Sequence, residues 1–264
     1  MTNGRVALHI ITGGSDAEQT RDGDWLDHDT RYRRTDEYLV LLRRTWTEER
    51  PFDFEGEFYH VAKAFSEIKP VQKPQIPLYF GGASDAAKKV GAEETDYYLL
   101  WGETVEMVRE RIEEMKVLAS EAGRTLKFGL RIHVVARETD DEARAAADHL
   151  VSEIPDRFQS MVDKIHTKGE SEGEKRQREL VKSAEDGWLT DHLWAGIGKA
   201  RLGVGTALVG SGESIAHCLD EYVDLGIDTF ILSGYPHLEE AQRFGRFVMP
   251  HFAGRTTTSA ALAA

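Results

Sequence analysis

The sequence has a single cysteine, Cys218, so an intrachain disulfide is excluded. Because a signal-peptide pattern is also lacking, the chain is predicted to be cytoplasmic. Cys218 lies in a stretch of helical periodicity at residues 213–225. We interpret it as a small apolar side chain buried in the core, which is the usual place of a lone cysteine.

Basic residues are also in short supply. The chain carries 33 Lys and Arg against 46 Asp and Glu, which gives a formal net charge of -13. Sequence-independent binding of nucleic acid needs clustered positive charge, so this composition argues against it, and against binding to anionic lipid. An anionic small molecule remains a possible ligand, because a pocket can be locally basic on an acidic protein.

Several familiar signatures are missing as well. No apolar stretch is long enough to span a membrane, and the ten histidines lack the spacing of metal ligands. The chain has neither a Gly-x-Ser-x-Gly nucleophile motif nor the lysine signature of a phosphate-binding loop. The sequence therefore predicts no metal site, no serine-hydrolase site and no P-loop.

What the chain does have is a repeated pattern of short apolar runs that end in glycine and polar residues. The clearest runs are residues 5–12, 78–80, 97–101 and 229–232, and a helical pattern follows nearly every one. Strand, polar loop and helix in repetition predict a βα-barrel or a doubly wound sheet, in which the loops after the strands carry the chemistry. A length of 264 residues suits one such domain.

Other elements follow from local signals. Residues 53–65 read as a hairpin around Gly56, and residues 126–136 as a strand. Ser84 and Thr139 are placed to cap helices at 84–92 and 139–153, the second with Glu142 as a capping box. Further helices are expected at residues 32–46, 104–122, 214–225 and 238–248.

One long segment departs from this pattern. Residues 155–189 are dominated by polar and charged side chains, and residues 193–210 are rich in glycine, which allows a backbone to change conformation at low cost. We interpret residues 155–205 as a mobile insertion, or lid, within a single domain that covers residues 1–264.

Arg131 and His133 form the strongest candidate pair for chemistry. Side chains alternate along a strand, so both point to the same side of the strand at 126–136, opposite a row of apolar residues. A buried guanidinium is costly unless it meets an anion. The pair is therefore either half of an internal ion pair with a carboxylate or an anion-binding and proton-transferring site, and we favour the second.

Weaker candidates lie in the loops after the strands. Residues 81–85, which include Gly82, Ala83 and Ser84, join a strand to a helix start, where free N–H groups and the helix dipole suit a phosphate. A tight turn with a capping serine would look the same. Each of the remaining candidates also has an ordinary structural reading, as a strand end, a surface residue or a packing residue; these are Thr12, His28, Trp101, Arg201 and Tyr235.

Short motifs along essentially the whole chain coincide in one family. They occupy residues 3–5, 11–13, 26–32, 78–82, 98–103, 128–134, 193–196, 205–210 and 225–240, and the last of these is highly specific. With these motifs, the chain resembles the two-component, flavin-dependent alkanesulfonate monooxygenases of the bacterial luciferase-like superfamily. The resemblance implies a TIM-type (β/α)8 barrel with an insertion before its last strand.

The same resemblance implies chemistry and partners. The family uses reduced FMN (FMNH2), delivered by a separate NAD(P)H-dependent FMN reductase, together with O2, to cleave the C–S bond of an alkanesulfonate into aldehyde and sulfite. This would place the chain in sulfur metabolism, as a homo-oligomer. Carried over by position, the cofactor-binding residues are Thr12, His28, Arg31, Tyr32, Gly82, Ala83 and Ser84. The residues that line the reaction site are Trp101, Arg131, His133, Arg201 and Tyr235, with Arg201 closing over the site to exclude water.

Two departures from the family pattern bear on these expectations. The glycine pair that follows the lid arginine in the family reads Leu202-Gly203 here. Family members also carry roughly 100 residues before the motif at 3–5, with about three of the eight strands and a cysteine. We therefore expect an incomplete barrel that retains flavin weakly.

Three interpretations stay open: an alkanesulfonate monooxygenase, a related enzyme that uses deazaflavin or reduced FMN on another substrate, and an inactive truncated remnant. The preferred sulfonate chain length is not set by the sequence.

Overall fold

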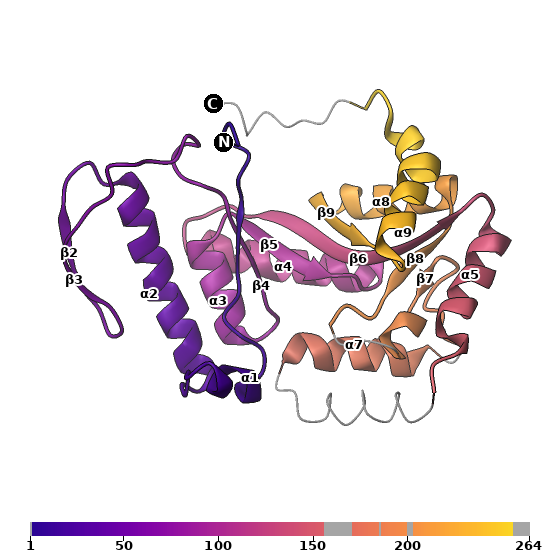
Figure 1. The fold of residues 1–264 in the computed structure, drawn as a ribbon, viewed down its shortest axis with the longest axis horizontal. Helices are drawn as coiled ribbons and strands as arrows, with labels where there is room; N and C mark the ends of the chain where they lie inside the picture. The colour runs from indigo at the N-terminus through magenta and orange to yellow at the C-terminus, as the bar shows by residue number, and fades with distance from the viewer. Residues whose placement is uncertain (1, 156–170, 185, 200–202, 256–264) are drawn as a thin grey trace. The chain divides into compact units, whose positions relative to one another are not determined.

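The computed structural model describes residues 2–155, 171–184, 186–199 and 203–255. The chain divides into two compact units (Figure 1). Among the described residues, the first unit contains those of Met1–Tyr98 and Met115–Leu126, and the second contains those of Leu99–Glu114 and Lys127–Thr256. The boundary runs through β5 (Tyr97–Trp101) and α4 (Val105–Glu121). None of the helices within the described ranges is long and apolar enough to cross a membrane.

The first unit is built around two parallel strands. β1 (Leu8–Ile10) pairs with β4 (Leu78–Gly81), so that Leu8 lies opposite Leu78 and Ile10 opposite Phe80. Leu78 and Phe80 are fully buried. α1 (Asp16–Arg21) and α2 (His28–Thr47) follow β1, and α3 (Asp85–Glu94) follows β4. Arg43 on α2 forms an ion pair with Glu94 at the end of α3, at 2.6 Å. The predicted alternation of strand and helix is confirmed here.

The hairpin predicted at residues 53–65 is present as β2 (Phe52–Glu55) and β3 (His60–Ala64), which pair in antiparallel fashion. The carboxylate of Glu37, on α2, accepts hydrogen bonds from the backbone N–H groups of Glu57, Phe58 and Tyr59 at 2.6–3.1 Å. A Cβ at residue 56 would lie 2.1 Å from the same carboxylate. The glycine at the turn is therefore required by the approach of Glu37.

The second unit is organised by one long strand, β6 (Lys127–Arg137). Its first half, residues 128–133, pairs in parallel with β9 (Ile227–Ser233), and its second half, residues 133–137, pairs in parallel with β8 (Ala207–Ser211). β7 (Leu193–Trp194) joins β8 in antiparallel fashion. The parallel strands with intervening helices give the α/β class predicted from the sequence.

The helices of the second unit begin largely where the caps predict. Thr139 forms a capping box with Glu142 at the start of α5 (Asp140–Ser152), and Ser211 caps α8 (Gly212–Asp224). α9 (His237–Arg243) leads into a π-helical turn, η2 (Phe244–Val248), and then into η3 (Met249–Phe252). Cys218 on α8 is buried, as predicted. A core forms where β6, β8, β7 and α5 meet, from Val135, Val209, Trp194, Ala143 and Ala147.

The sequence predicts the lid at residues 155–205 and no strand for the residues at the end of the glycine-rich stretch 193–210. Residues 207–211 form β8, a buried strand of the sheet. A Cβ at Gly210 would lie 3.0 Å from Asp140 Oδ1 and from Ser214 Cβ. This glycine allows close packing against α5 and α8 and does not mark a hinge.

The polar stretch before it is partly helical. α7 (Glu172–Ser183) begins at the capping residue Ser171, and η1 (Gly196–Lys199) follows β7. Gln177 and Leu180 of α7 are buried. Residues 156–170, 185 and 200–202 lie outside the described residues. The mobility predicted for residues 155–205 stays a prediction.

Candidate functional site

The loop between β4 and α3 has the features of an anion-binding site. Ser84 is the N-cap of α3, a helix of ten residues, and its hydroxyl accepts a hydrogen bond from Ala87 N at 3.2 Å. A Cβ at Gly82 would lie 2.6 Å from Ala87 Cβ and 3.3 Å from Tyr32 Oη. Gly82 therefore leaves the backbone bare beside a helix N-terminus, where N–H groups and the helix dipole favour negative charge.

Tyr32 belongs to the same cluster. It projects from α2, its ring lies edge-on to that of Phe80 with centroids 6.3 Å apart, and its hydroxyl forms a side-chain hydrogen bond with Ser84. Burial raises the pKa of the Tyr32 phenol, which keeps it protonated near neutral pH. A second phenol, that of Tyr98, donates to Gly82 O. Two phenols and a capping serine thus hold residues 82–84 in place.

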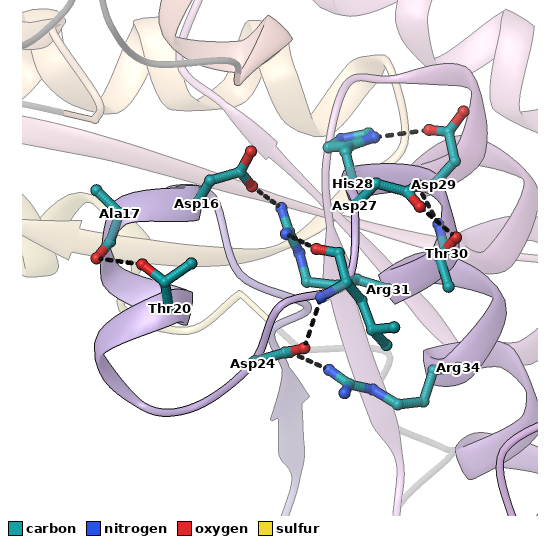
Figure 2. Close-up of polar contacts among 11 residues, drawn as sticks. Asp16, Ala17, Thr20, Asp24, Asp27, His28, Asp29, Thr30, Arg31 and Arg34 are labelled. Carbon is teal, nitrogen blue, oxygen red and sulfur yellow. Dashed lines mark hydrogen bonds and ion pairs between the residues drawn. The ribbon is translucent and has the colours of Figure 1, made fainter.

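Arg31 has a different role from its neighbour Tyr32. Its guanidinium is buried; Nη1 donates to Leu26 O at 2.6 Å and Nη2 pairs with Asp16 Oδ1 at 2.7 Å (Figure 2). Within the described part of the chain, Arg31 Nε is buried and has no hydrogen-bond partner. Arg31 therefore fastens α1 and the loop before α2, and its predicted contact with the cofactor stays a prediction.

His28 and Thr12 lie at the edges of the same region. His28 Nδ1 is 2.7 Å from Asp29 Oδ1 (Figure 2). The centroid of the His28 ring is 4.8 Å from that of Tyr32. Thr12 Oγ1 is 3.0 Å from Thr35 Oγ1, which in turn donates to Arg31 O. The structure thus groups His28 with Tyr32 and ties Thr12 to α2. Whether either contacts a ligand stays a prediction.

In the second unit, Arg131 and His133 lie on β6 as the alternation predicts. The opposite row, which includes Leu130, Ile132 and Val134, is buried. His133 is fully buried, and its Nδ1 lies 2.9 Å from Ser233 Oγ and 3.3 Å from Ser233 O on β9. The carbonyl oxygen of Ser233 can only accept a hydrogen bond, whereas its hydroxyl can donate to Nδ1 or accept from it.

Arg131 and Tyr235 line one pocket of about 570 Å³ at the end of β9, and the Tyr235 ring centroid is 5.6 Å from that of His133. The structure therefore brings three predicted reaction-site residues together. Other polar residues of the lining are Ser233, His237 and Glu240. The carboxylate of Glu240 is neutralised by Arg137 and Arg243, at 2.7 and 2.6 Å. Arg131 also lines the pocket, and its Nη1 donates a hydrogen bond to Ile132 O at 3.3 Å.

Trp101 ends β5, and the next residue, Gly102, donates its N–H to Arg131 O at 2.8 Å. The indole lies against Gly173 at the start of α7, where a Cβ would be 3.1 Å from the ring. Arg176 of α7 binds the Glu103 carboxylate through two hydrogen bonds, of 2.9 and 2.5 Å. Trp101 is thus adjacent to Arg131 through the backbone and packed by α7. Arg201 lies outside the described residues.

The family profile described as "Luciferase-like monooxygenase" matches residues 1–229. The chain belongs to this family. The wider resemblance drawn from the sequence motifs is thereby confirmed, while the alkanesulfonate branch within the family stays a prediction. The luciferase-like family also accounts for the repeated strand, loop and helix.

Solved structures show the fold this family member shares. The EDTA monooxygenase of Chelativorans sp. BNC1 matches 97% of this chain and 67% of its own, with a TM-score of 0.74 and 17% identity. A long-chain alkane monooxygenase matches 96% and 63%, with a TM-score of 0.73 and 19% identity. An F420-dependent secondary alcohol dehydrogenase matches 88% and 64%, with a TM-score of 0.58 and 19% identity. The chain spans about two thirds or less of the length of these structures.

Proposed function

We propose that this luciferase-like protein supplies the catalytic residues of an FMNH2-dependent alkanesulfonate monooxygenase. The observation that carries the proposal is the pocket in which Arg131 and Tyr235 meet, backed by the buried His133. A guanidinium offers a planar fork of N–H donors, which matches two oxygens of a sulfonate. In this proposal Arg131 binds and orients the substrate anion.

The loop at residues 82–84 fits the phosphate of FMN. Donors for an anion come from the backbone at Gly82, from the N-terminus of α3 and from the hydroxyl groups of Ser84 and Tyr32. A side chain larger than that of glycine would not fit at residue 82. We assign the phosphate to Gly82, Ala83 and Ser84, with Tyr32 and His28 beside them. The bound reduced flavin would supply two electrons and the reaction with O2.

The overall change would be alkanesulfonate, O2 and FMNH2 giving aldehyde, sulfite, FMN and water. One oxygen atom enters the aldehyde and the other leaves as water, and the C–S bond breaks. This chemistry needs a bound anion, a proton donor and acceptor, and exclusion of water. Arg131 suits the first task. His133, whose Nδ1 lies against Ser233, and Tyr235 suit the second.

The direct test is sulfite release from octanesulfonate, with FMN, NADPH, a flavin reductase and O2 present. We expect sulfite and octanal in equal amounts, and no release without the reductase. The matched control is Arg109→Ala, which removes an exposed arginine of α4. Oxidation of an alcohol with reduced deazaflavin as product, without sulfite, would instead support the deazaflavin reading. Absence of turnover with either cofactor would support a remnant.

Three further parts of the proposal come from the family resemblance. The reduced flavin would come from a separate NAD(P)H-dependent FMN reductase, the enzyme would be a homo-oligomer, and it would work in the cytoplasm. Size-exclusion chromatography with light scattering tests the second part: a strictly monomeric species at micromolar concentration would contradict it.

A further inference from the structure

Glu240 is a buried carboxylate with more partners than a helix residue usually has. It lies on α9 with none of its surface exposed. Oε1 accepts hydrogen bonds from Arg137 Nη1 and Arg243 Nη1, and Oε2 accepts one from Ala136 N at 3.3 Å. A buried carboxylate is strongly unfavourable unless it is paired and hydrogen-bonded, and here both oxygens are engaged. Glu240 therefore joins α9 to the end of β6.

The segment between β9 and α9, residues 234–236, packs against the side chain of Glu240. A Cβ at Gly234 would lie 2.6 Å from Glu240 Cβ and 2.6 Å from Val134 O. Gly234 therefore fits into the space between Glu240 and β6 only because it lacks a side chain. Its two neighbours are Ser233, which contacts His133, and Tyr235, which lines the pocket with Arg131.

We propose that Glu240 is a positioning residue that holds residues 233–235 against β6, and so fixes the ring orientation and tautomer of His133 beside Tyr235. Glu240 acts through the turn and does not itself bind the substrate. Three contacts connect Glu240 to His133. Glu240 binds Arg137 and Ala136 on β6 and packs against Gly234. Ser233, the residue before Gly234, then contacts His133 Nδ1. A catalytic effect of Glu240 rests on the proposed function, but the positioning of His133 by Glu240 does not.

The test uses the full chain with 15N-labelled histidine, and the ring signals of His133 are assigned by their loss in His133→Gln. In the wild type we expect one tautomer, protonated on Nδ1. Glu240→Gln keeps the shape of the side chain but removes its charge and one acceptor, so its single amide oxygen cannot serve both the arginines and the N–H of Ala136. We expect the two ring nitrogens of His133 to move to averaged shifts as the turn loosens. Glu239→Gln, the exposed neighbour, is the control and should leave them unchanged.

A second readout uses turnover. If octanesulfonate is the substrate, Glu240→Gln should lower kcat at least tenfold and change KM less than twofold, because Arg131 still binds the anion. If the wild type releases no sulfite, the proposed function fails, while the ring signals still decide whether Glu240 positions His133. A folded Glu240→Gln variant with wild-type His133 signals would overturn the inference.

If Glu240→Gln does not fold, the variant Arg243→Met provides the test. It removes the partner of Glu240 whose side chain is 36% exposed and keeps the ion pair between Glu240 and Arg137. We expect the same shift of the His133 signals, smaller in size but larger than in Glu239→Gln. Unchanged signals in Arg243→Met would then count against the inference.

Discussion

The imidazole of His133 and the backbone of Ser233 are held together although 100 residues separate them in the sequence. His133 Nδ1 lies 3.3 Å from Ser233 O and 2.9 Å from Ser233 Oγ, at the register position where β6 and β9 pair. The position of the His133 ring relative to Ser233 is thus set by strand pairing.

The role of Arg131 leads to the first prediction. We expect Arg131→Ala to lower sulfite release from octanesulfonate by about two to three orders of magnitude, the scale seen when a donor to a developing negative charge is removed. Arg131→Lys should recover part of this loss, because an ammonium keeps the charge but not the fork of donors. Arg109→Ala should behave like the wild type. Near wild-type turnover in Arg131→Ala would remove this residue from the mechanism.

Much of the fold follows from local sequence signals, and the exception is instructive. The caps at Ser84 and Thr139 are set by contacts within a few residues, and the hairpin at residues 53–65 has a local turn signal in Gly56, although its turn also binds Glu37 of α2. β8 was missed because it closes a glycine-rich stretch, residues 193–210, that resembles a flexible loop. The need for Gly210 comes from Asp140, 70 residues earlier in the chain, and a contact of that kind has no local signature.

A second prediction concerns the attachment of α7. The buried side chain of Gln177 donates to Gly102 O at 3.1 Å and accepts from Gly205 N at 2.8 Å, so it links the residue after Trp101 to the approach to β8. Gln177→Leu would leave the Gly205 N–H without its acceptor. We expect a loss of about 1–3 kcal/mol in the free energy of unfolding. Urea denaturation measures this, with the exposed Glu179→Gln as control. An unchanged midpoint in Gln177→Leu would show that α7 is not held by this side chain.

The candidate site was predictable in part. Alternation along β6 placed Arg131 and His133 correctly, because a strand has only two faces. Glu240 was not recognised as a structural residue, although a signal existed: it shares a helical stripe with Phe244 and the buried Val248, four and eight residues on. A carboxylate on an apolar stripe needs buried partners. Sequence alone does not identify Arg137 as one of them, because the two lie 103 residues apart.

The third prediction concerns Cys218. Burial raises the pKa of its thiol from 9.0 to about 11, so at pH 8 only on the order of one native thiol in a thousand is ionised. Iodoacetamide should therefore modify the native chain very slowly and the urea-unfolded chain readily, as measured by mass spectrometry. The neutral thiol favours the folded state, and this contribution to stability is complete below pH 9 and is lost as the pH rises from 9 to about 11. Rapid labelling of the native chain at pH 8 would contradict the buried position.

The last prediction separates the two tasks of Ser84, which caps α3 and is assigned to the FMN phosphate. Ser84→Asp keeps a good capping side chain for Ala87 N but places a negative charge where the phosphate would bind. We expect the thermal stability to stay close to that of the wild type and FMN affinity to fall at least tenfold. The affinity for riboflavin, which lacks the phosphate, should be unchanged. Ser84→Ala should lose about 0.5–2 kcal/mol of stability with its cap and weaken FMN binding less.

Quenching of flavin fluorescence gives both affinities in one experiment, and the ratio between FMN and riboflavin isolates the phosphate. If the aspartate repels the phosphate, the preference for FMN over riboflavin should be lost in Ser84→Asp. It should be retained in Ser84→Thr, which keeps the hydroxyl. If Ser84→Asp bound FMN as tightly as the wild type does, the phosphate would have to lie away from the N-terminus of α3. The close approach permitted by Gly82 would then be explained by packing against Ala87 alone.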